Sequence, residues 1–203
     1  MLALMQGMMS LGVGGGGGGT VTWNPADKAA SIALSGGNKT ATSSVSSVHE
    51  IVRATLGRST GKWYFEISFS PAGGATGFSG VSPNTLAPSG NYPGISATSW
   101  GYLQLNGNKY NSGSAVGFGA DFNGVANVGT AIDLDLGRIW WAKDGVWQAS
   151  GNPAANTNPA YTGLSGTLFP TASFFESARV CVGRFAAADL IYAPPAGFAA
   201  WDS

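Results

Sequence analysis

The sequence predicts an all-β fold, and three observations support this prediction. Glycine is the most frequent residue, with 32 of the 203 positions, and Ser, Thr and Asn are concentrated between apolar runs. Short runs rich in β-branched and aromatic residues are separated by turn signals, as in proteins built from many short strands. Amphipathic helical windows of useful length are absent from the sequence. Short strands without intervening helices predict an antiparallel β-sandwich of two sheets.

The segment Gly129–Trp147 carries the clearest strand signal. Apolar residues alternate with two aspartates over residues 132–136, which is the period of two expected of a strand. Arg138–Lys143 is rich in β-branched and aromatic residues and predicts the next strand. Asp144-Gly145 favours the left-handed backbone of a two-residue hairpin turn. The segment therefore predicts consecutive hairpin strands that belong to the scaffold.

Strand signals recur along the remainder of the chain. In Lys62–Phe69, the odd positions Trp63, Phe65, Ile67 and Phe69 are expected on one face and the even positions on the other. Further strands are expected at Thr20–Trp23, Ser31–Leu34, Lys39–Ser43, Glu50–Leu56, Thr76–Val81, Ser99–Gln104, Lys109–Tyr110, Val128–Leu134, Thr171–Phe175, Arg179–Arg184 and Leu190–Tyr192.

Charge and reactive residues argue against several functional classes. Ten basic and ten acidic residues give a net charge of zero, which favours neither nucleic acid nor an anionic membrane as a partner. A single cysteine, Cys181, excludes an internal disulfide and a cysteine-based metal site, and its apolar run favours burial. His49 is the only histidine, which excludes a histidine metal cluster. The sequence also lacks the Gly-x-Ser-x-Gly motif that would accompany a catalytic serine and histidine. We expect no metal and no cofactor.

Asp133 and Asp135 are the only pair that suggests chemistry. Two carboxylates on one strand face could form a glycosidase pair or part of a calcium site. The run lacks the oxygen-ligand density of a calcium loop, and we expect both aspartates to line a solvated face or to pair with Arg138 or Lys143. The sequence therefore predicts that the protein is not an enzyme.

Residues 1–19 differ from the domain expected over residues 20–203. They carry no charge and contain all four methionines, followed by the uninterrupted glycines Gly14–Gly19. A secretory signal would need basic residues near its start, and a membrane span would need about 20 apolar residues. A disordered tail and an apolar docking peptide on a glycine tether remain, and we favour docking. The expected docking residues are Leu2, Leu4, Met5, Met8, Met9 and Leu11.

The segment Ser89–Tyr110 is the best candidate for a binding surface. It mixes aromatic residues with small polar ones, a composition typical of binding loops and suited to uncharged sugars. The alternative is that Trp100 and Tyr102 belong to the core of the sheet. The candidate ligand-binding residues are Tyr92, Trp100, Tyr102, Asn106, Asn108 and Tyr110.

An ordered set of motifs resembles the SPRY domain family over about residues 21–201. The motifs are GKWYFEI at Gly61–Ile67, WGY at 100–102, AIDLDLGRIWWAKDGVW at 131–147, YTGLSG at Tyr161–Gly166, TLFPTASF at Thr167–Phe174 and APPAGF at Ala193–Phe198. WNPADKAASIALSGGN near the start and PPAGFAAW near the end resemble SPRY domains of tailed-phage structural proteins. The sequence departs from the family pattern at Asn127-Val128-Gly129 and at Gly183-Arg184-Phe185.

The resemblance implies a bent β-sandwich that binds other molecules without transforming them. In phage-like proteins it implies a virion structural protein on the particle surface, as a decoration, fibre or tail component. Such a protein would be anchored to other virion proteins through residues 1–19, present in several copies, and directed toward host attachment, with a host-surface polysaccharide as a ligand. The alternative function is an intracellular protein–protein interaction module that recognises a peptide. Neither function requires nucleic acid or insertion into a membrane.

Overall fold

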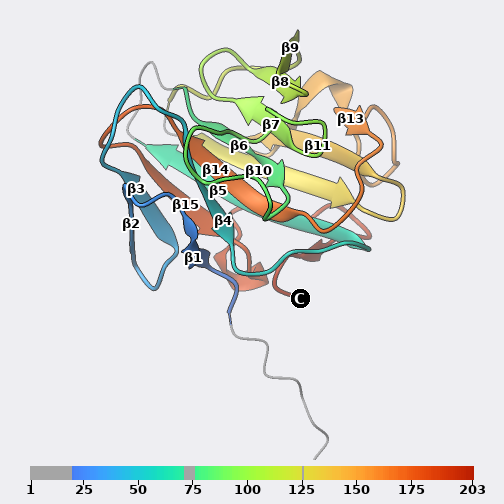
Figure 1. The fold of residues 1–203 in the computed structure, drawn as a ribbon. Coiled ribbons are helices and arrows are strands. Elements are labelled where there is room, and N and C mark those ends of the chain that lie inside the picture. The colour runs from blue at the N-terminus through green and yellow to red at the C-terminus, as the bar shows by residue number, and fades with distance from the viewer. Residues whose placement is uncertain (1–19, 71–75, 125) are drawn as a thin grey trace, which may run out of the picture.

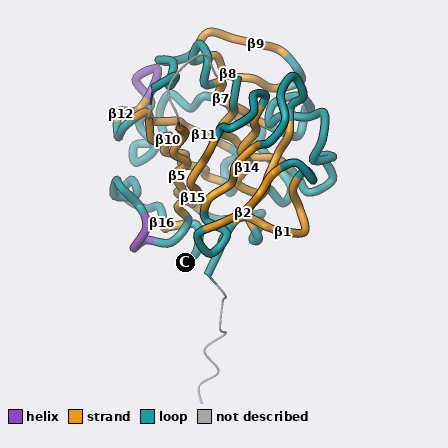
Figure 2. Tube along the Cα trace, turned by 90° about the vertical axis from the view of Figure 1, so that its left-hand side faces the viewer, coloured by secondary structure: helices purple, strands orange, loops and turns teal. Residues whose placement is uncertain are grey.

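The computed structural model describes residues 20–70, 76–124 and 126–203, and these residues form two packed β-sheets (Figure 1). All strand pairs are antiparallel except one parallel contact between β5 (Lys62–Ser70) and β16 (Ala199–Ala200). The helical residues in the described part are two 3-10 turns, η1 (Gln148–Ser150) and η2 (Ala187–Asp189), as Figure 2 shows. The all-β antiparallel sandwich expected from the sequence is therefore confirmed.

The first sheet contains seven strands in the order β1-β4-β14-β6-β7-β8-β9. We call it the seven-stranded sheet. Its strands are β1 (Trp23–Lys28), β4 (Glu50–Ala54), β14 (Phe169–Phe174), β6 (Phe78–Ser82), β7 (Trp100–Leu103), β8 (Asn108–Asn111) and β9 (Ser114–Gly117).

The second sheet contains nine strands, and seven of them follow the order β12-β11-β10-β5-β15-β3-β2. We call it the nine-stranded sheet. Besides β5 and β16, its strands are β2 (Ile32–Ser35), β3 (Thr40–Ser43), β10 (Ala126–Asp133), β11 (Arg138–Lys143), β12 (Val146–Trp147), β13 (Tyr161–Thr162) and β15 (Val180–Arg184).

The core fills the space between the sheets, as the alternation within β5 predicts. Phe65, Ile67 and Phe69 are buried in the main apolar cluster, and Trp63 packs against it. Tyr64 points the other way, into a smaller apolar cluster on the outer face of the nine-stranded sheet. Cys181 lies in the main cluster, so its expected burial is confirmed, and burial raises the pKa of its thiol.

The hairpin between β11 and β12 has the turn that the sequence predicts. Asp144 and Gly145 have φ angles of 48° and 80°, and Lys143 pairs with Val146 across the turn. Both turn residues are in the left-handed region, which matches the twist of the flanking strands.

The expectation for Asp133 was wrong, and Asp135 is exposed as expected but lies in a turn and not on the sheet face. Asp133 is 1% exposed at the end of β10, where its carboxylate accepts the backbone N–H groups of Asp135 and Leu136 and pairs with Lys62. Asp135 lies in the following turn and accepts the N–H of Gly61 at 2.8 Å. The two aspartates therefore terminate the strand and fix its turn.

Arg138 and Lys143 were the expected partners of these aspartates, and both bind elsewhere. Their side chains donate to the carbonyl oxygens of Asn156 and Asp121, at 2.9 and 2.7 Å. Neither cation is therefore part of a carboxylate pair across the hairpin.

Two strand predictions also need correction. β1 continues through Asn24-Pro25, where the sequence predicted a stop, because a proline without an N–H is tolerated on the edge strand of a sheet. Residues 190–192 do not form a strand, because the N–H groups of Ile191 and Tyr192 donate to the side chain of Glu66.

The two ends of the described chain meet. The N–H of Val21 donates to the side chain of Asp202 at 3.1 Å, and the C-terminus lies beside the start of β1 in both views (Figures 1 and 2). The expected docking residues, within Leu2–Leu11, lie outside the described residues. Within the part of the chain described, no helix is long and apolar enough to cross a membrane.

Candidate functional site

A loop of residues 83–99 covers the outer face of the seven-stranded sheet, and we call it the cover loop. It contains no charged residue. Two backbone hydrogen bonds fasten it to the chain around β4: Ile51 N–H donates to the Pro88 carbonyl, and Gly90 N–H donates to the His49 carbonyl, both at 2.8 Å. The loop therefore lies flat on the sheet.

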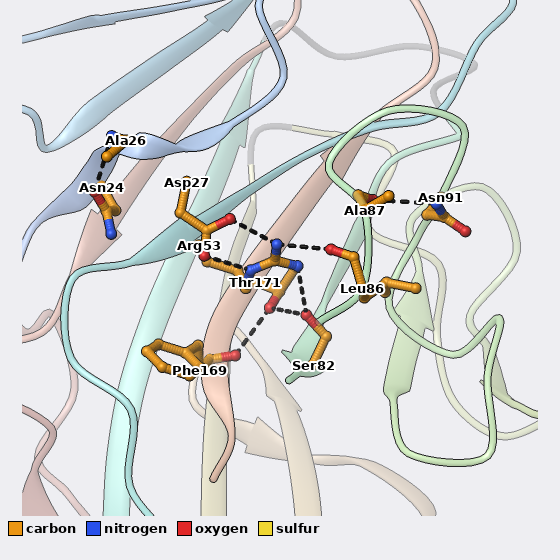
Figure 3. Close-up of polar contacts among 10 residues, drawn as sticks. All are labelled: Asn24, Ala26, Asp27, Arg53, Ser82, Leu86, Ala87, Asn91, Phe169 and Thr171. Atoms are coloured by element: carbon orange, nitrogen blue, oxygen red, sulfur yellow. Dashed lines mark hydrogen bonds and ion pairs between the residues drawn. The ribbon is translucent and has the colours of Figure 1, made fainter. Parts of the chain in front are cut away.

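Arg53 holds the cover loop near its start, at Leu86 (Figure 3). Its neighbours Val52 and Ala54 in β4 point into the core, so the Arg53 side chain points to the outer face, where it is 0% exposed. Its Nε and Nη2 donate to both oxygens of Asp27 at 2.8 and 2.6 Å, and Nη2 also donates to the Leu86 carbonyl at 2.7 Å. This ion pair, in which only Arg53 is fully buried, thus fixes the backbone of the cover loop.

The polar network continues from Arg53 across two more strands. Arg53 Nη1 donates to Ser82 Oγ at 3.3 Å, Ser82 shares a hydrogen bond of 2.9 Å with Thr171 Oγ1, and Thr171 donates to the Phe169 carbonyl (Figure 3). In the same view, Asn91 donates to the Ala87 carbonyl within the cover loop. The loop and the sheet beneath it are therefore joined by side chains from β1, β4, β6 and β14.

Two glycines let the cover loop approach the sheet closely. A Cβ on Gly101 would lie 1.9 Å from the Pro93 carbonyl oxygen. A Cβ on Gly80 would lie 2.9 Å from the Pro93 side chain and 2.1 Å from the Trp100 carbonyl oxygen. No side chain larger than hydrogen fits at either position without moving the backbone.

Aromatic rings gather around Tyr92 of the cover loop, and we call them the aromatic group; the Phe78 ring is buried and the others are half-buried. Tyr92 stacks on Phe78 with ring centroids 4.7 Å apart, and Tyr110 contacts both rings edge-on. His49 lies 4.8 Å from both Tyr92 and Phe175, measured between ring centroids. Together with the exposed residues of the cover loop, the aromatic group forms a surface that we call the cover-loop face.

Burial sets the ionisation of this surface. It lowers the pKa of His49 below the ordinary value of 6.5, an effect that the Glu176 carboxylate partly opposes. Burial also raises the pKa of Tyr92. His49 and Tyr92 are therefore neutral at pH 7. Because the cover loop contains no charged residue, the surface offers uncharged hydrogen-bonding groups and aromatic rings.

The structure divides the six candidate ligand-binding residues between core and surface. Trp100 and Tyr102 are 4% and 0% exposed and belong to the main apolar cluster, which is the alternative that the sequence left open for them. The Tyr102 hydroxyl donates to the Ala120 carbonyl. These two rings support the sheet from its inner side.

The other four candidates lie at the surface but in two places. Tyr92 and Tyr110 are in the aromatic group. Asn106 is exposed in the turn before β8, where its side chain accepts the N–H of Asn108 at 3.1 Å. Tyr92 and Tyr110 therefore remain with the cover-loop face, and the two asparagines form a separate turn.

Sequence reasoning missed Arg53 and Asp27. One signal was available, because Arg53 is the only charged residue within the strand segment Ile51–Leu56. Charged residues in such a strand are rarely buried unless they are paired, so Arg53 required a carboxylate partner. Nothing in the sequence identified Asp27, which lies 26 positions away.

The described residues provide no candidate metal centre. Within residues 20–70, 76–124 and 126–203, no three His, Cys, Asp or Glu side chains are grouped so that they could hold a metal ion. The arrangement around the cover loop can hold a partner by shape and neutral hydrogen bonds.

Comparison with known proteins shows the fold of this chain. No family model and no curated protein matches the sequence. Among solved structures, the SPRY domain of human HERC1 is similar, with a TM-score of 0.66 and 15% sequence identity. The match covers 84% of this chain and 99% of the HERC1 chain. The chain therefore has a SPRY-like fold.

Proposed function

We propose that this chain is a non-enzymatic binding module and that it contacts a partner protein through the cover-loop face. The observation that carries this proposal is the clamping of the cover loop by the buried Arg53. A loop that is already fixed in shape loses little conformational freedom when a partner binds, so more of the contact energy appears as affinity. Aromatic rings beside it supply the rigid anchors that are common at protein interfaces.

Exposure along the cover loop supports the same proposal. Asn84, Thr85, Ala87, Ser89 and Gly90 are exposed, and all five are small or uncharged. A partner can approach such a surface without removing water from a charge, which is the costly step in many interfaces. We propose a short peptide or loop of the partner as the ligand.

A peptide selection with a matched pair of variants tests the proposal. Peptides selected from a random library on the full chain are measured against wild type, Ala87→Arg and Ala154→Arg. Both alanines are exposed, but Ala154 lies away from the cover loop, in the segment before β13. We expect the arginine at position 87 to weaken binding at least about tenfold and the arginine at position 154 to leave it unchanged. Equal binding by all three proteins contradicts the proposal.

We also propose that the module is a virion structural protein anchored by residues 1–19. The support is the resemblance of WNPADKAASIALSGGN and PPAGFAAW to SPRY domains of phage structural proteins, together with the uncharged, methionine-rich leader. Copies on a particle surface would gain avidity for a host polysaccharide even when each contact is weak. Deletion of residues 1–19 should leave a folded protein that no longer joins its particle, as measured by mass spectrometry of purified particles. Normal incorporation of the truncated chain contradicts this role.

A further inference from the structure

A pocket of about 280 Å³ opens on the outer face of the nine-stranded sheet, away from the cover loop. Side chains of β5, β10 and β15 form its floor, and the turn before β12 and residues 191–192 form its walls. The volume is close to the lower limit for small-molecule sites, so the pocket has room for one small ring. Its lining residues are Ser68, Ala126, Asn127, Asp144, Arg184, Ile191 and Tyr192.

A buried carboxylate fixes one wall of this pocket. Glu66 is 0% exposed, and its two oxygens accept the N–H groups of Ile191 and Tyr192 at 2.8 and 2.9 Å. It also accepts the Tyr64 hydroxyl at 2.9 Å. The wall is therefore attached to the sheet and preformed.

A chain of hydrogen bonds organises the floor. Arg184 Nη1 donates to Ser68 Oγ at 2.5 Å, and Ser68 Oγ donates to Asn127 Oδ1 at 2.7 Å. This chain directs the Asn127 carbonyl toward Ser68, and Asn127 Nδ2 is left buried without a partner among the described residues. These hydrogen bonds hold the polar floor of the pocket in place in the free protein.

One positive and one negative group border the pocket without neutralising each other. All ten acidic residues lie in the described ranges, and none places a carboxylate oxygen within 4.0 Å of the Arg184 guanidinium. Across the pocket, Asp144 is exposed and uses one carboxylate oxygen to accept the Asn127 N–H at 2.9 Å. A ligand with a net charge of either sign would be attracted by one of these groups and repelled by the other, so its charge brings little net gain, whereas a neutral ligand can accept from Arg184 and donate to Asp144.

Apolar surface surrounds the polar floor. Val146 is 67% exposed and Ile191 is 55% exposed, the two highest values among the large apolar side chains that the structure describes. The Tyr192 ring packs over Gly145, where a Cβ would lie 2.6 Å from the ring. The ligand that suits this pocket has hydroxyl groups along one edge and C–H surface beside them.

We propose that this pocket binds a single neutral sugar ring, with adjacent hydroxyls bridging Arg184 and Asp144 and the C–H face against Ile191 and Tyr192. A vicinal diol both accepts and donates hydrogen bonds, as the two opposed groups require. A pyranose also combines such an edge with an apolar face. The inference is independent of the proposed cover-loop interface with a partner protein, because it concerns a different sheet; a sugar pocket would also suit the polysaccharide role proposed for a virion protein.

NMR titration of the full chain with free monosaccharides tests the pocket. The probes are glucose, galactose, mannose and N-acetylglucosamine, with acetate and acetamide as small acid and amide controls. We expect at least one sugar to bind saturably, with a dissociation constant on the order of a millimolar, and to shift the amide signals of residues 127, 144, 191 and 192. The acid and the amide should leave these signals unchanged.

Two variants and a matched control test whether Arg184 and Asp144 bind the sugar. Asp144→Asn preserves the turn, because asparagine tolerates a positive φ and can still accept the Asn127 N–H. We expect Asp144→Asn and Arg184→Gln each to weaken sugar binding about tenfold. Asp121→Asn, at another exposed aspartate, should leave it unchanged. The proposal is overturned if no sugar shifts the pocket signals, if the shifts fall on residues 83–99 instead, if acetate or acetamide binds in place of sugars, or if folded variants bind like wild type.

Discussion

The two sheets cover their outer faces in different ways, although a buried charged residue holds the cover in each case. On the seven-stranded sheet, Arg53 binds a loop carbonyl and pairs with Asp27. On the nine-stranded sheet, Glu66 binds the N–H groups of Ile191 and Tyr192 and has no cation within 4.0 Å among the described residues. One face thus relies on an ion pair and the other on backbone donors.

This difference shows two solutions to the same problem. A buried charge needs either an opposite charge or several oriented hydrogen bonds, since both replace the water that is lost. The third donor to Glu66 is Tyr64, and burial together with the Glu66 carboxylate raises the pKa of its hydroxyl, so the proton stays in place. Because Glu66 does not use the neighbouring Arg184, that cation is left to the pocket.

The largest expected effect comes from breaking the ion pair. Arg53→Met leaves the Asp27 carboxylate without its partner and releases the Leu86 carbonyl. We expect unfolding free energy, measured by urea denaturation, to fall by up to about 3 kcal/mol, the lower end of the range for a buried pair, because the Asp27 side chain is 19% exposed and water can reach it. Arg138→Met, at a half-buried arginine without a carboxylate partner among the described residues, is the control and should cost much less. Equal decreases in unfolding free energy for the two variants would show that the Arg53 ion pair stabilises the protein no more than an ordinary arginine hydrogen bond does.

Removing the charge of Glu66 should have the next largest effect. Glu66→Gln retains the shape of the side chain, but it weakens three hydrogen bonds and turns an NH₂ group toward N–H or O–H donors. We expect a loss of about 2 kcal/mol in unfolding free energy. Hydrogen exchange should increase at Ile191 and Tyr192, while the amide of Gly90 on the other sheet stays protected. Faster exchange on both faces would mean that the two covers are not independent.

A pair of glycine variants tests how closely the cover loop must approach its sheet. Gly101→Ala places a methyl group against the Pro93 carbonyl oxygen and should destabilise the protein by about 1–3 kcal/mol. Gly117→Ala in β9 is the control, because a Cβ there would meet no atom closer than 4.0 Å. Thermal denaturation should separate the two variants. Equal melting temperatures would indicate that the loop moves aside without cost.

The smallest effect is a pH dependence of stability that comes from His49, beside the cover loop. The folded pKa of His49 is lowered, so the unfolded state binds the proton more readily. The contribution of neutral His49 to the unfolding free energy is therefore complete above the unfolded pKa of about 6.5, and it is lost as the pH falls through the folded pKa. When the pH is lowered from about 7.5 to 5, the unfolding free energy of His49→Gln should decrease less than that of wild type. A constant difference between the two proteins across this range would exclude His49 as the source.

Local patterns were enough to predict most of the scaffold. The alternation in β5 identified its buried face, and Asp144-Gly145 identified a hairpin turn, because both features depend on neighbours in sequence. The apolar run at 190–192 was misassigned because its backbone donors are satisfied by Glu66, a side chain 125 positions away. The alternation of apolar and polar residues along the sequence cannot reveal a hydrogen-bond partner so far away in the chain.

The candidate site was less accessible to sequence reasoning for the same reason. Tyr92 and Tyr110 were predicted to bind a ligand because their segment mixes aromatic and small polar residues, and their rings are in contact in the structure. Trp100 was selected by the same criterion but faces the core, because strand parity rather than composition decides its direction. The contact of Gly101 with Pro93 joins a strand to a loop that folds back on it, and only the tertiary structure shows that contact.

The hydrogen bond between Val21 and Asp202 has a practical consequence for protein engineering. Because the first and last described residues are neighbours, a short linker could join them, and new termini could be opened in an exposed connection such as residues 154–155. The same proximity would let the sandwich be spliced into a surface turn of an unrelated host protein with little strain at the junctions. Both sheets' outer faces would then remain accessible on such a chimera.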